Sequence, residues 1–158
     1  MMLVHHQREV IVQGRLEVIC GCMFSGKTAM LIDRILRARQ DGLRVAVLKH
    51  VSDDRYAKKE LVTHDRQRLP AECVTVSADV LARADEADVI AVDEAQFFDN
   101  EIHVVCRRLV QLGKQVVLAG LDLDSWGQPF GAMPELAAMA DEVVHMHAQC
   151  AVCHGVAS

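Results

Sequence analysis

The residue pattern with the most specific chemistry lies at positions 21–28, where the sequence reads GCMFSGKT. It matches G-x-x-x-x-G-K-[ST] at every fixed position, which is the signature of a loop that cradles phosphate groups. Its glycines let backbone amides turn toward phosphate oxygens, and the start of the following helix adds partial positive charge. We expect Lys27 to reach the β and γ phosphates of a nucleoside triphosphate and the Thr28 hydroxyl to bind Mg²⁺. The loop residues are Gly21, Cys22, Met23, Phe24, Ser25, Gly26, Lys27 and Thr28.

Two adjacent carboxylates, Asp93 and Glu94, end an apolar run at 89–92. A carboxylate at the end of a buried strand can hold Mg²⁺ directly or through water, which is the role we expect for Asp93. Glu94 would then face the reacting centre and accept a proton from an attacking hydroxyl group or water, in a kinase or in an ATPase. An isolated Asp-Glu pair is commonly only a solvated strand end. The preceding phosphate loop favours the interpretation as a nucleotide site.

The elements that must position these residues alternate between strands and helices. Apolar spacing predicts a strand at 15–20 and a helix at 28–39, on either side of the phosphate loop. Further strands are expected at 44–48, 73–76, 88–92, 115–121 and 142–147. Further helices are expected at 79–87, with Ser77 as its N-cap, and at 135–140. Another helix is expected to begin after Asp99 or Asn100 as its N-cap and to end at Gly113. The polar stretch 50–70 shows no periodicity and is predicted to be a long loop that is either functional or disordered.

Strands that are apolar on both sides imply a mostly parallel sheet covered by helices on both faces, and hence an α/β fold. The chain has 158 residues, which is about the size of one domain. We expect a nucleotide-binding domain over residues 1–147 and a short remnant of a second lobe over 148–158.

Charge and hydropathy exclude several classes of function. The net charge is −5 and no basic block occurs along the chain, so phosphate neutralisation of a nucleic acid is not expected. No segment approaches the roughly 18 apolar residues of a membrane span, and the amino terminus lacks the apolar core of a signal peptide. We therefore predict no nucleic-acid partner, no membrane association and a cytoplasmic location.

Several short segments together resemble the type II, cytosolic family of thymidine kinases, from about residue 14 to residue 157. They are GCMFSGKT at 21–28, DRY at 54–56, THD at 63–65, DEAQFF at 93–98, and PFG at 129–131 after Leu121-Asp122. The resemblance implies a P-loop core of the RecA type, use of Mg-ATP, and transfer of the γ-phosphoryl group to the 5′-hydroxyl of thymidine. It also implies a homo-oligomer, usually a tetramer.

By this resemblance, Glu94 is the catalytic base, and Arg55 lies near the transferred phosphoryl group. A guanidinium there is chemically sensible because charge spreads over the γ oxygens in the transition state. Gln96 falls at a position grouped with the nucleotide site. Without the resemblance, the charged run around Arg55 would read as a solvated surface.

The resemblance also implies a pocket for the nucleoside. Phe97 matches an aromatic residue placed against the base, and Met23 and Phe130 belong to the pocket wall. Ser125 stands where the family commonly has an aromatic residue over the base, and Trp126 follows it. Cys22 replaces the usual proline, a change that should leave phosphate binding intact.

Cys150 and Cys153 form the one C-x-x-C pair of the sequence, a spacing typical of half of a zinc site. A structural zinc site wants four ligands, and the family's covering loop and second ligand pair have no counterpart before Ser158. His147 or His154 could complete a makeshift site. The loss of a covering loop predicts a raised KM for the nucleoside and some ATP hydrolysis.

Two alternatives to the kinase stay open at this point. One is a P-loop ATPase of the RecA or helicase type, which shares the strand, the phosphate loop and the Asp-Glu pair. The other is a catalytically impaired ATP-binding subunit. The acidic net charge, the absence of a basic stripe, and the segments 63–65 and 97–98 favour the kinase.

Overall fold

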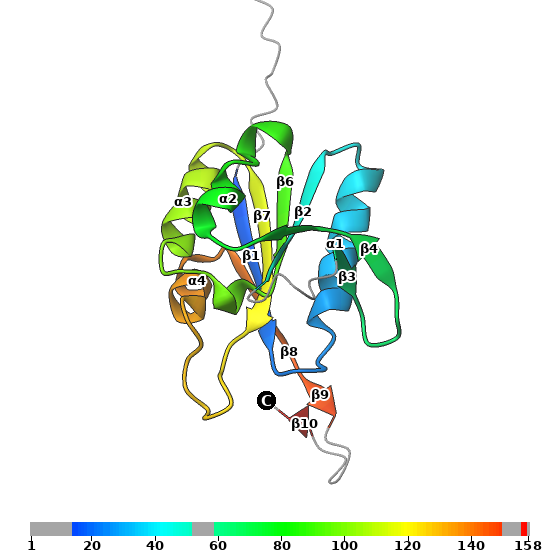
Figure 1. Ribbon diagram of the computed structural model, residues 1–158, viewed down its shortest axis with the longest axis vertical. Coiled ribbons are helices and arrows are strands. Elements are labelled where there is room, and N and C mark those ends of the chain that lie inside the picture. The colour runs from blue at the N-terminus through cyan, green and yellow to red at the C-terminus, as the bar shows by residue number, and fades with distance from the viewer. Residues whose placement is uncertain (1–13, 52–58, 150–155, 158) are drawn as a thin grey trace, which may run out of the picture.

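A computed structural model describes residues 14–51, 59–149 and 156–157 of the protein (Figure 1). The strands of its main sheet are β1 (Arg15–Gly21), β2 (Val45–His50), β5 (Glu72–Val74), β6 (Val89–Asp93), β7 (Gln115–Leu121) and β8 (Glu142–Met146). They form one six-stranded sheet in the order β5-β2-β6-β7-β1-β8, and every neighbouring pair in it is parallel. The predicted α/β fold with a parallel sheet is confirmed.

Helices cover both faces of this sheet. Helix α1 (Lys27–Gln40) lies on one face, and α2 (Ser77–Leu81), α3 (Ile102–Gln111) and α4 (Met133–Met139) lie on the other (Figure 1). Short 3₁₀ turns, η2 (Ala84–Glu86) and η3 (Ala95–Phe97), flank β6. Helices make such connections between parallel strands, because each one returns the chain to the amino-terminal ends of the strands, where the next strand begins.

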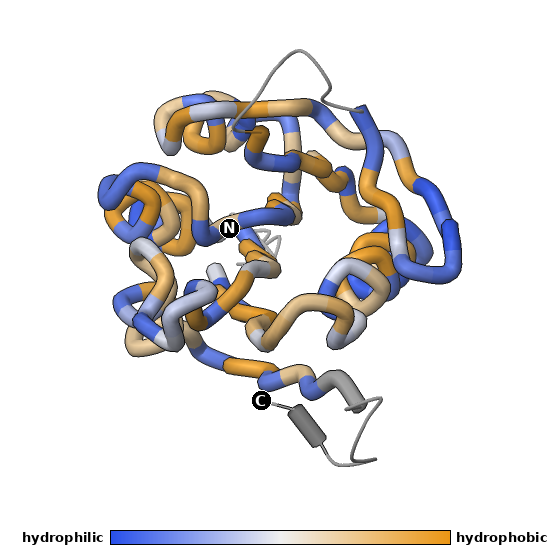
Figure 2. Tube along the Cα trace, turned by 60° about the horizontal axis from the view of Figure 1, so that its bottom comes forward, coloured by the Kyte–Doolittle hydropathy of each residue, from blue (hydrophilic) through white to orange (hydrophobic). Residues whose placement is uncertain are grey.

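The strands are buried on both sides, so alternate residues of one strand enter two different cores. In β1, Val18 and Cys20 pack toward α3 and α4, whereas Ile19 packs toward Leu31 and Ile35 of α1. This alternation follows from the two-residue period of a strand. Hydrophobic segments accordingly gather inside the molecule (Figure 2). The phosphate loop is thus held between a strand and a helix that are each anchored in a core.

The polar stretch at 50–70 contains a hairpin that the sequence did not predict. Strands β3 (Glu60–Val62) and β4 (Arg68–Pro70) pair antiparallel, with Leu61 opposite Leu69. Both leucines are buried against the core on the α1 side. Two isolated leucines therefore anchor a hairpin that is otherwise polar, which is why a search for periodicity finds nothing there.

The predicted caps of two helices are wrong. Ser77 is the first residue of α2 and not its cap, and its hydroxyl donates a hydrogen bond to Asp99 Oδ1 at 2.8 Å. Asp99 Oδ1 also accepts a hydrogen bond from the Ser77 N–H, so its carboxylate binds the start of α2. The N-cap of α3 is Glu101. The helix expected at 79–87 divides into α2 and the turn η2.

Beyond the main sheet, β9 (Ala148–Gln149) and β10 (Val156–Ala157) form a small antiparallel pair. Cys150, Cys153 and His154 lie outside the described residues, so the zinc site expected there stays a prediction. Among the helices of the described ranges, none is both long and apolar enough to cross a bilayer.

Candidate functional site

Many of the sequence-predicted site residues meet at the carboxyl ends of the parallel strands, where α/β sheets bind their ligands. A cavity of about 630 Å³ opens there. Its walls come from the phosphate loop and the start of α1, from the end of β6 and the residues that follow it, and from the end of β7. They include Met23, Phe24, Gly26, Lys27, Thr28, Asp93, Glu94, Gln96, Phe97, Gly120 and Leu121. One concave surface therefore unites the phosphate loop with the acidic pair, which lies more than sixty residues further along the chain.

Side chains of the phosphate loop form hydrogen bonds within the loop. Lys27 Nζ donates to the Cys22 carbonyl oxygen at 2.5 Å and to Ser25 Oγ at 3.3 Å, and Ser25 Oγ donates to the same carbonyl at 2.7 Å. Gly26 has φ 90°, a conformation that side-chain-bearing residues rarely adopt. The ammonium group thus lies over the loop, where it is positioned to receive phosphate oxygens.

Burial lowers the pKa of Lys27, and the negative charges of the carboxylates of Asp93, Glu94 and Asp122 oppose that shift. The ammonium group is therefore poorly solvated and surrounded by acidic groups. An anionic ligand with several oxygens, such as a triphosphate, would supply the hydrogen-bond acceptors that water no longer provides.

Thr28 and Asp93 are brought together as the sequence predicts for a Mg²⁺ site. Thr28 Oγ1 donates to Asp93 Oδ2 at 3.0 Å, and Asp93 Oδ1 accepts from the Glu94 N–H at 2.9 Å. Burial, with the Glu94 charge as the second cause, raises the pKa of Asp93 to about 6. A buried carboxylate beside a hydroxyl group offers the hard oxygen ligands that Mg²⁺ prefers, so these residues fit the ion.

Glu94 adopts a left-handed backbone conformation with φ 59°, which is uncommon for a residue other than glycine. Its carboxylate Oε2 accepts a hydrogen bond from Gln96 Nε2 at 2.8 Å. Gln96 Oε1 in turn accepts from the Leu121 N–H at 3.1 Å. The buried Gln96 side chain thereby ties Glu94 to the end of β7, and the unusual φ is of the kind found where a side chain must be aimed.

An aromatic side chain, Phe97, lines the same cavity as Glu94. The rings of Phe97 and Phe130 meet edge-on with centroids 5.4 Å apart, and Phe97 is partly exposed toward the cavity. Phe98 is buried in the core. Ser125 is exposed in the loop after β7, where Asp124 Oδ1 accepts from the Trp126 and Gln128 amides, and it is not among the residues that line the cavity. Arg55 lies outside the described residues.

The turn of the β3–β4 hairpin forms a further wall. Thr63, His64 and Asp65 line the cavity, and the His64 ring meets Phe24 edge-on at 5.6 Å between centroids. Thr63 Oγ1 donates to Asp65, whose pKa this hydrogen bond lowers. In the sequence this tripeptide is one of the segments that carry the family resemblance, and the hairpin accounts for how it reaches the phosphate loop.

His50, at the end of β2, was missed by the sequence analysis. It is buried, and the centroid of its ring lies 4.6 Å from that of Phe98 and 5.9 Å from that of Phe97. Its Nε2 lies 3.0 Å from the Thr75 carbonyl oxygen and therefore carries the proton, and no hydrogen-bond partner reaches its buried Nδ1 among the described residues. Only a preceding apolar strand marks it in the sequence.

We expect His50 to make the protein sensitive to mild acid. Burial lowers its pKa, while the Thr75 hydrogen bond and the charges of Glu94 and Asp99 oppose this. A histidine with a depressed folded-state pKa stabilises the fold above its unfolded pKa of about 6.5, and that contribution is lost as the pH falls through the folded value. The free energy of unfolding of His50→Gln should therefore decline less than that of wild type between pH 7 and pH 5.

Urea unfolding at several pH values measures this difference, with His147→Gln as the control because His147 is exposed. The slope for His50 is limited to about 1.4 kcal/mol per pH unit. Parallel stability curves for wild type and His50→Gln would contradict the expectation.

The fold and the site together define a P-loop nucleotide-binding protein of the α/β class. Among solved structures, the flagellar accessory protein FlaH from Methanocaldococcus jannaschii is similar in fold, with a TM-score of 0.57 over 90% of this chain and 74% of that one at 13% sequence identity. The thymidine kinase family model matches residues 14–158. The chain belongs to the thymidine kinase family.

Curated relatives agree with this assignment. The thymidine kinase of Bacteroides thetaiotaomicron is 46% identical over 153 residues, which cover 97% of this chain and 77% of that protein. The thymidine kinase of Porphyromonas gingivalis is 42% identical over 154 residues, 98% of this chain and 76% of the relative. The family match favours the kinase over the ATPase of the RecA or helicase type.

Proposed function

We propose that this chain transfers the γ-phosphoryl group of ATP to the 5′-hydroxyl of thymidine, giving dTMP and ADP. The observation that carries the proposal is the position of Glu94. Its carboxylate lies in the same cavity as Lys27 and Thr28 and is oriented by Gln96. A phosphate site with a positioned carboxylate suits transfer to a hydroxyl group that a second substrate brings.

The proposed roles follow the chemistry of each side chain. Lys27 and the loop amides bind the β and γ phosphates, and Glu94 accepts the proton of the attacking hydroxyl group. Thr28 and Asp93 would hold Mg²⁺, which when bound neutralises charge on the phosphate oxygens. Asp93 must be ionised to do so, and a bound cation favours the ionised form against the burial that raises its pKa.

The nucleoside is proposed to lie between the acidic pair and the aromatic side chains. Phe97 is exposed and lines the cavity with Glu94, and its ring packs edge-to-face with that of Phe130. Met23 is exposed and lines the same cavity. Contacts from Ser125 and charge stabilisation by Arg55 remain proposals that rest on the family resemblance.

We also propose that the protein is a homotetramer, that it is cytoplasmic, that it has no nucleic-acid partner, and that Cys150 and Cys153 belong to a zinc site. The chain spans about three quarters of the length of the curated relatives described above.

The experiment for the proposed function is a comparison of nucleosides. The protein is incubated with Mg-ATP and thymidine, deoxycytidine, deoxyguanosine or deoxyadenosine, and nucleoside monophosphate is quantified separately from free phosphate. We expect kcat/KM to be largest for thymidine. A chain that releases only free phosphate with every nucleoside would support the ATPase instead, and ATP binding with no product would support an impaired subunit.

Gln96→Ala tests the positioning of Glu94. We expect kcat to fall about ten- to hundredfold, because the carboxylate loses its hydrogen-bond donor and the Leu121 N–H loses its acceptor. The KM for ATP should change little, since Gln96 has no hydrogen bond to the phosphate loop. Gln128→Ala, on the exposed loop after β7, is the matched control. A loss of ATP affinity equal to the loss of kcat would instead assign Gln96 to the nucleotide site.

A further inference from the structure

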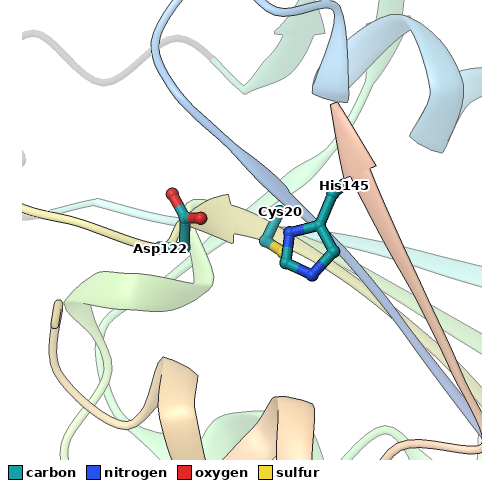
Figure 3. A group of neighbouring side chains, drawn as sticks. All are labelled: Cys20, Asp122 and His145. Atoms are coloured by element: carbon teal, nitrogen blue, oxygen red, sulfur yellow. The ribbon is translucent and has the colours of Figure 1, made fainter. Parts of the chain in front are cut away.

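A second group of chemically active side chains lies next to the nucleotide site and has no part in the proposed reaction. Cys20, Asp122 and His145 each offer one ligand atom, and these three atoms all lie within 4.8 Å of one another (Figure 3). The residues come from the ends of the three neighbouring strands β1, β7 and β8. Within the described ranges, this is the one group of three or more such residues with metal-ligand spacing.

Sheet register fixes two of the three ligands. Cys20 and His145 are direct partners in the parallel pairing of β1 with β8, so both side chains stand on the same face of the sheet. Cys20 Sγ lies 3.3 Å from His145 Nδ1. Tetrahedral zinc with Zn–S of about 2.3 Å and Zn–N of about 2.0 Å places sulfur and nitrogen about 3.5 Å apart. The observed separation is close to this value without any movement of the backbone.

The third ligand is held by its backbone. Asp122 directly follows β7, and its carbonyl oxygen accepts from the Phe130 N–H at 3.0 Å. Its carboxylate points toward the Cys20–His145 pair in Figure 3. The backbone of Asp122 is therefore fixed, and a carboxylate oxygen already lies within 4.8 Å of the other two ligand atoms.

Burial and access also suit a bound ion. Cys20 is only 2% exposed, whereas His145 is exposed, so the group reaches from the core to the surface. A cavity of about 180 Å³ adjoins the group and is otherwise lined by Leu123, Pro129, Met133, Pro134 and Ala137.

We propose that Cys20, Asp122 and His145 form a binding site for a zinc-class divalent ion, with a water molecule as the fourth ligand. Thiolate, imidazole and carboxylate are the three ligand types that zinc uses in proteins. Binding forms one metal–sulfur bond, and the thiol proton passes to the solvent, so one proton is released per ion bound. The ion would join β7, β1 and β8 directly behind the phosphate loop and so stabilise its base. The site is independent of the proposed reaction and differs from the expected Cys150–Cys153 site.

Cobalt titration of the 158-residue chain tests the proposal. The metal-stripped protein carries Cys150→Ser and Cys153→Ser, so that the carboxyl-terminal pair contributes no thiolate. We expect one Co²⁺ per chain, a thiolate-to-cobalt charge-transfer band, and release of one proton. Zn²⁺ should displace the cobalt and raise Tm.

Ligand variants are then compared in the same background. We expect Cys20→Ser to abolish the charge-transfer band, and His145→Asn and Asp122→Asn to weaken Co²⁺ binding about tenfold or more. His147→Asn and Cys106→Ser are the matched controls, an exposed histidine and a buried cysteine outside the group, and both should bind cobalt as the background does. His145 is exposed, so its variant remains informative if Cys20→Ser fails to fold.

The outcomes separate clearly. Binding lost with Cys150→Ser and Cys153→Ser alone would overturn the proposal and assign the metal to the carboxyl-terminal pair. Unchanged cobalt affinity in His145→Asn and Asp122→Asn would also overturn it, because the thiol would then act without the other two ligands.

Discussion

Replacing Glu94 with glutamine should lower the rate of nucleoside phosphorylation about 10²- to 10⁴-fold, the usual contribution of a general base. Glutamine preserves the size of the side chain and can still accept the Gln96 hydrogen bond, but an amide cannot take a proton from the 5′-hydroxyl. ATP affinity should stay within about twofold, since Glu94 has no hydrogen bond to the phosphate loop. Steady-state kinetics of dTMP formation and calorimetric titration with ATP measure the two quantities.

Glu101→Gln is the matched control, because Glu101 is exposed at the start of α3. It should retain full activity. Equal losses of ATP affinity and kcat in Glu94→Gln would contradict the division of roles between Glu94 and the phosphate loop. Near-normal dTMP formation would show that another group accepts the proton.

Lys27→Ala should have the second large effect. The ammonium group lies over the loop at hydrogen-bond distance from the Cys22 carbonyl, where it can meet the β and γ oxygens. Removing a fixed positive donor from a developing negative charge typically costs about 10²- to 10³-fold in rate. We expect a loss of that size in kcat/KM for ATP, together with loss of the thermal stabilisation that ATP gives to wild type.

Lys114→Ala is the control for charge alone. Lys114 precedes β7, so it lies at the amino-terminal ends of the strands, whereas the cavity lies at their carboxyl ends. Lys27→Arg provides a second comparison. A guanidinium is larger and planar, so it should restore the charge without restoring the rate. If Lys27→Ala binds and uses ATP as wild type does, the cavity around the phosphate loop is not the nucleotide site.

The local signals in the sequence were sufficient for the framework of the site. The glycine pattern at 21–28 predicted the phosphate loop because its chemistry requires contiguous residues. The apolar run before Asp93 predicted a buried strand with carboxylates at its end. Both predictions depend on neighbours along the chain, and the structure reproduces β1, α1 and β6 to within a residue or so at each end.

Contacts between distant segments could not be predicted in the same way. The β3–β4 hairpin depends on Leu61 and Leu69, which only tertiary packing distinguishes from other apolar residues. Asp99 looks like a helix cap in sequence, yet it binds Ser77, twenty-two residues away. The pairing of Cys20 with His145 follows from sheet register across 125 residues. Register of this kind is set by the whole sheet and leaves no local pattern.

The fate of the γ-phosphate is the most direct test of the central claim, that Mg-ATP and a nucleoside react in the one cavity between Lys27 and Glu94. ATP labelled at the γ position is mixed with excess protein and Mg²⁺ in a single turnover, with and without thymidine. We predict that with thymidine most of the label appears in dTMP, and that Glu94→Gln abolishes this transfer. Label that appears only as free phosphate, at the same rate with or without thymidine, would contradict the claim.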